Sequence, residues 1–248
     1  MLMKDPNTTL SPGAGSSSSS SGGGGGGGSS SSSSSSSSSV RVQWPAERLP
    51  PRPWFFGDSH ATRLPLLDSL PELLGVKPES LGAQQHAVDG SRLVDVLPQI
   101  RANSVETLRT SMTHVVVWTG TEDVRATERM LQRSARRGLP GFLRADFENL
   151  LSALTVCCGF GVQPIIVRVA TPNTVLCASV NDIWAAVAEK AGVNVGWVDP
   201  VWDDSGQPVT ERRTSTESSS LVPAQALDYE ATLARIADAL IATPSNSR

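Results

Sequence analysis

The chain has 248 residues, a net charge of −3 and 39% hydrophobic residues. No hydrophobic run approaches the roughly 18 residues that cross a bilayer, so we expect no membrane span. The first residues lack the hydrophobic core of a signal peptide. Cysteine is rare, with three in the chain, which favours a reduced, intracellular and cytoplasmic protein.

The sequence divides into two unequal parts. Residues 16–39 are only serine and glycine. Such a segment has no hydrophobic surface to bury and nothing to offset the entropy lost on ordering. We therefore expect residues 1–39 to form a disordered tail and residues 40–248 to form one folded domain.

Strand-length hydrophobic runs alternate with helix-period segments in the second part. Leucines spaced through 64–74 indicate a helix, which Pro65 and Pro71 should delay or break, and Pro98 should interrupt the helix at 91–102. The expected strands are 54–56, 81–88, 113–120, 163–170 and 193–200. The other expected helices are 122–137, 142–157, 174–192 and 224–241. This alternation predicts an α/β fold, a three-layer αβα sandwich with a mostly parallel five-stranded sheet.

Polar residues follow three of the expected strands. They are Gly57-Asp58-Ser59, Asp89-Gly90-Ser91 and the run Thr119 to Asp123. In parallel sheets, ligand sites lie beyond the carboxyl ends of the strands. We therefore expect these three segments to meet at one edge of the sheet.

With these motifs in this order, residues 52–242 resemble the SGNH (GDSL-type) hydrolases. The resemblance implies a flavodoxin-like fold and ester hydrolysis. It assigns the nucleophile to Ser59 within Gly57-Asp58-Ser59, makes Asp58 a further candidate catalytic residue, and assigns oxyanion-binding N–H groups to Ser59 and Gly90. We expect no metal and no cofactor, and an acyl ester as the substrate if the site is active.

Two blocks depart from the family pattern. Glu122 occupies the position of the family's oxyanion asparagine, and an ionised carboxylate accepts hydrogen bonds but cannot donate them. The family's Asp-x-x-His, which supplies the acid and base, falls on Ser220 and Pro223, and no such motif occurs anywhere in the chain. A serine without a base is a poor nucleophile.

The chain has three histidines that could replace the missing base. His60 follows Ser59 directly, and adjacent helix residues do not face each other. His114 begins a strand at the edge away from the site. His86 is therefore the one candidate base, with a partly buried position in the sheet as the alternative.

Two further groups could bind a ligand. The expected helix 122–137 carries an arginine face, Arg125, Arg129, Arg133, Arg136 and Arg137, which could contact RNA or an acidic protein, or be simply solvated. Trp197 and Trp202 could line the mouth of the site, or pack in the core.

Three functions remain open from the sequence. The preferred one is a non-catalytic SGNH-like binding or interaction module whose partner the sequence does not identify. The second is an active esterase or acyl hydrolase that uses Ser59 with His86 as base. The third is a nucleic-acid-binding domain of a protein derived from a mobile element.

Overall fold

The computed structural model describes residues 50–66, 68–110, 112–133, 139–159, 161–203 and 226–243, with backbone only at 103–110. The expected tail, residues 1–39, and Ser220 to Pro223, which align with the family's Asp-x-x-His, lie outside these ranges. The structure therefore tests only the elements expected within these ranges.

The centre of the domain is a five-stranded parallel sheet with strand order β2-β1-β3-β4-β5. This 2-1-3-4-5 order is that of flavodoxin-like folds. The strands are β1 Pro53–Gly57, β2 Gln84–Gln85, β3 His114–Trp118, β4 Gln163–Val167 and β5 Gly196–Val198. The predicted α/β class and parallel sheet are confirmed.

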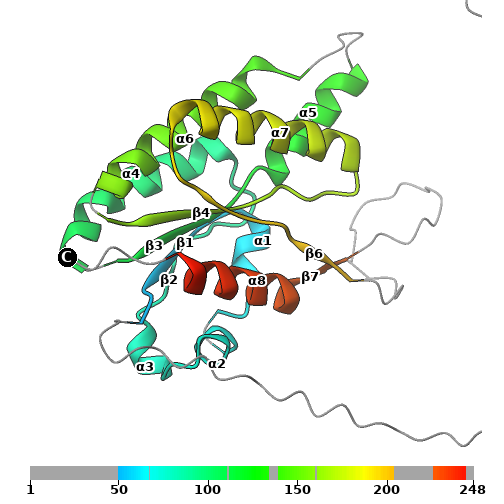
Figure 1. Cartoon of the computed structure of the whole chain (residues 1–248). Coiled ribbons are helices and arrows are strands. Elements are labelled where there is room, and N and C mark those ends of the chain that lie inside the picture. The colour runs from blue at the N-terminus through cyan, green and yellow to red at the C-terminus, as the bar shows by residue number, and fades with distance from the viewer. Residues whose placement is uncertain are drawn as a thin grey trace, which may run out of the picture. The chain divides into compact units, whose positions relative to one another are not determined.

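Helices cover both faces of this sheet and make the three layers visible in Figure 1. Along β1, Trp54 and Phe56 pack toward one face and Phe55 toward the other, all at most 2% exposed. The first face is covered by α4 Leu93–Thr110, α5 Thr121–Arg133, α6 Gly141–Gly159 and α7 Thr174–Ala191. The second is covered by α1 Ser59–Thr62, α2 Leu70–Leu74, α3 Pro78–Leu81 and α8 Tyr229–Ala242.

The expected interruption at Pro98 is wrong, because α4 continues through it. A proline inside a helix removes one hydrogen bond. Leu93, Val96 and Ile100 of the same helix are at most 2% exposed against the sheet. Burying three such side chains stabilises the helix by several kcal/mol, more than the proline costs. The helix expected from residue 64 begins at Leu70, in line with the delay that its prolines predict.

Two differences lie near the end of the chain. A short antiparallel ribbon of β6 Val201–Trp202 and β7 Leu227–Asp228, which the sequence did not predict, precedes the last helix. The last helix begins at Tyr229 rather than near 224, because the side chain of Asp228 accepts the Ala231 N–H at 2.8 Å and caps it.

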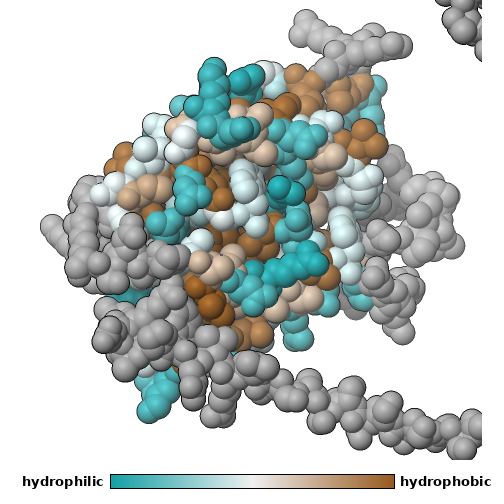
Figure 2. Space-filling view, in the orientation of Figure 1, coloured by the Kyte–Doolittle hydropathy of each residue, from teal (hydrophilic) through white to brown (hydrophobic). Residues whose placement is uncertain are grey.

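The surface mixes polar and hydrophobic side chains, as Figure 2 shows for one face of the described domain. The six large hydrophobic side chains that are exposed in the described residues are Leu73, Val88, Val94, Met130, Val156 and Val175. No helix among the described residues is both long and hydrophobic enough to cross a membrane.

Candidate functional site

The turn between β1 and α1 packs directly on the end of β3. Gly57 has a φ of +154°, and a Cβ placed there would lie 1.9 Å from the carbonyl oxygen of Trp118. The next backbone N–H, that of Asp58, donates to the same carbonyl at 3.0 Å. Glycine is required here because the two backbones approach too closely for a side chain. This contact fixes where Ser59 leaves the sheet.

The Asp58 carboxylate joins two turns at the edge of the sheet. It is fully buried, and its oxygens accept the N–H of His60 at 3.0 Å and the N–H of Thr121 at 3.1 Å. Burial raises the pKa of Asp58 from 3.8 to about 6, against the opposing effect of these hydrogen bonds. Asp58 therefore positions the start of α1 against the start of α5.

Ser59 is the first residue of α1 and is half-buried. Its carbonyl oxygen accepts the Thr62 hydroxyl at 2.9 Å. Within the described ranges, the Ser59 hydroxyl has no hydrogen-bond partner. A serine acting as nucleophile needs a neighbouring base to remove its proton. No described side chain forms a hydrogen bond with the Ser59 hydroxyl.

The other two oxyanion positions belong to turns tied to this one. The Val88 N–H donates to the Gly57 carbonyl at 3.0 Å, and the chain then turns through Gly90, whose φ is +74°. Glu122 follows Thr121, the residue whose N–H Asp58 accepts. The three polar segments therefore meet at one sheet edge, as the sequence predicts.

Glu122 is paired with a neighbouring arginine and provides no hydrogen-bond donor to the site. Its Oε1 lies 2.6 Å from Nη1 of Arg125, one turn along α5. The charge of Glu122 also contributes, after burial, to the raised pKa of Asp58. A carboxylate beside a forming oxyanion would repel it, and losing a single oxyanion donor costs about 2.7–4 kcal/mol of transition-state stabilisation.

His86, the candidate base, lies on the sheet edge beside β1. Its ring stacks on the Phe56 ring, with 5.0 Å between the ring centroids, and is tilted against the Trp54 ring, with 4.9 Å between the centroids. Its Nε2 lies 3.2 Å from the side-chain oxygen of Gln84, and burial lowers its pKa. Among the described contacts, none joins His86 to Ser59. The structure therefore does not bring the proposed base and nucleophile together.

The other two histidines have structural partners elsewhere. His60 Nδ1 lies 2.8 Å from the hydroxyl of Tyr229, and its ring stacks on Trp118 at 5.4 Å. His114 is buried at the start of β3, where Nε2 lies 3.2 Å from the Thr243 carbonyl oxygen. His60 thus links α1 to α8, and His114 is at the opposite end of its strand from the site.

Asp123 is an important residue to which sequence reasoning gave no role. It is 1% exposed and accepts the Leu93 N–H at 2.8 Å and Nε of Arg92 at 3.0 Å. Asp123 therefore provides, from outside α4, a hydrogen-bond acceptor for a backbone N–H in the first turn of that helix. Its place directly after Glu122, in the third polar segment, was the only signal available.

Replacing Asp123 with alanine is expected to cost about 3 kcal/mol of unfolding free energy, because a buried N–H and a buried part of Arg92 lose their acceptor. Urea unfolding followed by tryptophan fluorescence measures this. The control is Asp95→Ala, which removes an exposed carboxylate from the same helix terminus and should cost about 1 kcal/mol or less. Equal losses in the two variants would contradict the role given to Asp123.

The arginine face divides into two parts. Arg125 is occupied by Glu122, whereas Arg129 and Arg133 line a groove of about 340 Å³ together with Arg92, Met130, Ala126 and Phe142. Arg136 and Arg137 lie outside the described residues.

The two tryptophans belong to different environments. Trp197 packs against the core, 6.4 Å from the Phe147 ring, with the Arg168 guanidinium 5.6 Å from its own ring. Trp202 lies in the ribbon opposite Leu227. The contacts of Trp197 are those expected for packing in the core and not for lining the mouth of the site.

No family model and no curated protein matches this chain in sequence. Solved structures do match. A GDSL-like lipase from Bacteroides thetaiotaomicron is 15% identical with a TM-score of 0.49, over 82% of this chain and 93% of that one. A member of the lipolytic G-D-S-L family from Veillonella parvula is also 15% identical with a TM-score of 0.42, over 77% and 96%. A psychrotrophic esterase from a Pseudoalteromonas species is 16% identical with a TM-score of 0.39, over 59% and 76%. These three structures are thus a GDSL-like lipase, a lipolytic G-D-S-L protein and an esterase, all at low sequence identity to this chain.

Proposed function

We propose that this chain is a degenerate SGNH-type domain that keeps the fold and the serine but does not hydrolyse esters, and that it acts as a binding module. The observation that carries the proposal is the environment of Ser59. Within the described residues its hydroxyl has no hydrogen-bond partner, and the three histidines are engaged with other groups.

The remaining elements of the family's machinery support the same conclusion. The two positions that align with the acid and the base are Ser220 and Pro223, neither of which can titrate near neutral pH. Glu122 supplies negative charge where the family has a donor. Because the members of a serine triad act together, losing one removes most of the rate.

The Gly57-Asp58-Ser59 turn has a structural role that does not require catalysis. Gly57 permits the close approach to β3, and Asp58 satisfies two buried N–H groups. These contacts stabilise the fold whether or not Ser59 reacts.

Labelling with a fluorophosphonate probe, which reacts with activated serines, is the test. We expect no labelling of the folded full-length chain between pH 6 and pH 9, the same result as for Ser59→Ala, while an active serine esterase is labelled in parallel. Labelling that disappears in Ser59→Ala would overturn the proposal and favour the esterase. In that event, loss of labelling in His86→Ala would identify His86 as the base.

A second variant tests whether charge alone silences the site. Glu122→Asn restores the family's side chain at the oxyanion position but supplies no base, so we expect this variant to remain unlabelled. Labelling of Glu122→Asn would mean that a base is present and that the repulsion by Glu122 is what blocks the reaction.

A further inference from the structure

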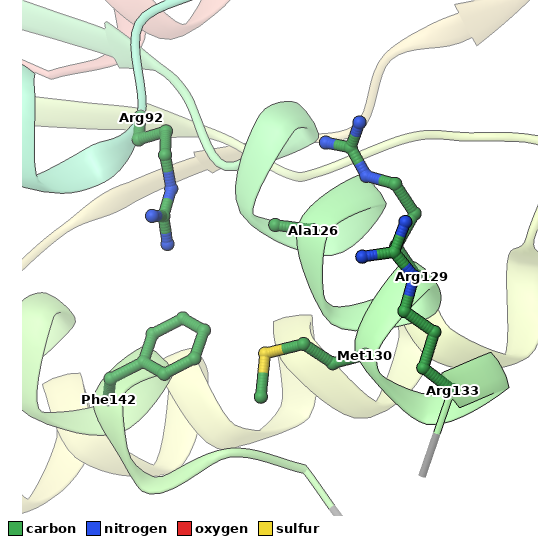
Figure 3. A pocket seen from close by; sticks show the side chains of 6 residues that line it. All are labelled: Arg92, Ala126, Arg129, Met130, Arg133 and Phe142. Carbon is green, nitrogen blue, oxygen red and sulfur yellow. The ribbon is translucent and has the colours of Figure 1, made fainter.

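We propose that the groove between α5 and the start of α6 binds a small phosphate monoester with a flat hydrophobic body. The proposal names a site and a ligand class for the binding role proposed above, and rests on it to that extent. The groove has a volume of about 340 Å³, which is in the range of small-ligand pockets. Figure 3 shows the side chains that line it.

Two guanidinium groups at one end of the groove are available to an anion. Arg129 and Arg133 are one turn apart on α5 and exposed, and neither has an ion-pair or hydrogen-bond partner among the described residues. The nearest acidic residue on the helix, Glu128, accepts a hydrogen bond from Asn173 at 3.2 Å. Like charges one turn apart repel each other, and a dianion between them would relieve that repulsion.

The middle of the groove is hydrophobic. Met130 is 50% exposed, and its thioether extends toward the Phe142 ring in Figure 3. An exposed methionine beside an aromatic ring forms an adaptable surface for an aromatic or aliphatic group. The groove therefore pairs a basic end with a hydrophobic floor.

The far end of the groove determines the orientation of the ligand. Arg92 lies over the Phe142 ring at 5.5 Å, but its charge is balanced by the buried Asp123 at 3.0 Å. Asp146, one turn beyond Phe142, adds a carboxylate that interacts with both Asp123 and Arg92. Because this end carries more acid than base, the phosphate should contact Arg129 and Arg133, with the hydrophobic body over Met130 and Phe142.

The charge distribution favours a small ligand over a nucleic acid. The whole chain has a net charge of −3, which opposes the general attraction that nucleic-acid binding requires. Two available arginines match one phosphate group rather than a strand.

Methionine-methyl NMR tests the proposal on the full-length chain. The chain has four methionines, Met1, Met3, Met112 and Met130, so ¹³C-methyl labelling gives four signals, and Met130→Leu assigns the one in the groove. Titration with phenyl phosphate should shift the Met130 signal and leave that of buried Met112 unchanged. The Met112 signal also reports that each variant is folded.

Paired variants identify the residues responsible. Arg129→Gln with Arg133→Gln should weaken phenyl phosphate binding at least about tenfold. The matched control, Arg144→Gln with Arg235→Gln, removes the same charge from exposed residues outside the groove and should bind as the unmodified chain does. Equal weakening in both pairs, or no Met130 shift at all, would overturn the proposal.

Three other probes define the ligand class. Inorganic phosphate should bind more weakly than phenyl phosphate, and benzyl alcohol should produce no shift. Inorganic phosphate binding as tightly as phenyl phosphate would overturn the hydrophobic part of the proposal. A short single-stranded oligonucleotide that shifts Met130 where phenyl phosphate does not would replace it with nucleic-acid binding. Fluorophosphonate labelling depends on Ser59 alone, so failure of this proposal and failure of the non-catalytic one are seen in separate experiments.

Discussion

Replacing Gly57 with alanine is expected to cost more than about 4 kcal/mol of unfolding free energy, a large share of the stability of an ordinary domain. The added Cβ would lie 1.9 Å from the Trp118 carbonyl oxygen, 2.7 Å from its carbonyl carbon and 2.9 Å from the Cβ of Ala61. Two of these atoms belong to the backbone of β3, the central strand, and cannot move without breaking the sheet. Urea unfolding followed by tryptophan fluorescence measures the loss.

Gly90→Ala is the matched control for backbone strain. Gly90 also has a positive φ, +74°, but no atom lies within 4 Å of the position of its Cβ. Alanine there should lose about 1–2 kcal/mol from the left-handed conformation alone. If Gly57→Ala were no less stable than Gly90→Ala, the close approach of β1 and β3 would not be the reason that Gly57 must be glycine.

The second large effect concerns the pH dependence of stability through Asp58. Burial raises its pKa in the folded state to about 6, whereas the unfolded chain has the ordinary value of 3.8. Between these values the folded state binds more protons than the unfolded state, so stability falls as the pH rises. Protonated Asp58 therefore adds about 3 kcal/mol to the unfolding free energy, relative to its ionised form. This stabilisation is fully present below pH 3.8 and is lost above about pH 6.

Asp58→Asn isolates this contribution. Asparagine does not titrate, so the variant should lack the fall in stability between pH 4 and pH 6. The measurement is the difference in unfolding free energy between Asp58→Asn and the unmodified chain, at several pH values from 4 to 7. Asp68→Asn, which alters an exposed aspartate, is the matched control. A difference that stays constant across this range would contradict the burial effect on Asp58.

Sequence pattern and structure agree best in two strands of the sheet. The run Trp54 to Phe56 and the run Val115 to Trp118 are buried on both faces of the sheet, and such strands have near-continuous hydrophobic sequences. Pattern alone therefore located them. Pro98 was misread because the cost of a proline is local, whereas the packing that outweighs it comes from the sheet and α6.

The candidate site was predicted unevenly for the same reason. Ser59, Gly90 and Glu122 occur in short motifs that follow strands, and the parallel sheet brings such segments to one edge. His86 was a reasonable candidate base by elimination. Its ring orientation, which is set by Phe56 and Trp54, could not be read from the sequence.

By itself, the sequence determined the α/β class, the parallel sheet, the position of the serine turn and the absence of the family's Asp-x-x-His. These properties follow from hydrophobic period and local motifs, which depend on neighbours along the chain. The tertiary structure alone decided that Asp58 accepts the Thr121 N–H, that Asp123 pairs with Arg92, and that His60 contacts Tyr229, 169 positions away. It also placed Met130 and Phe142 in one groove with the arginines. Such contacts depend on how distant helices and turns pack against the sheet, and no local pattern encodes that.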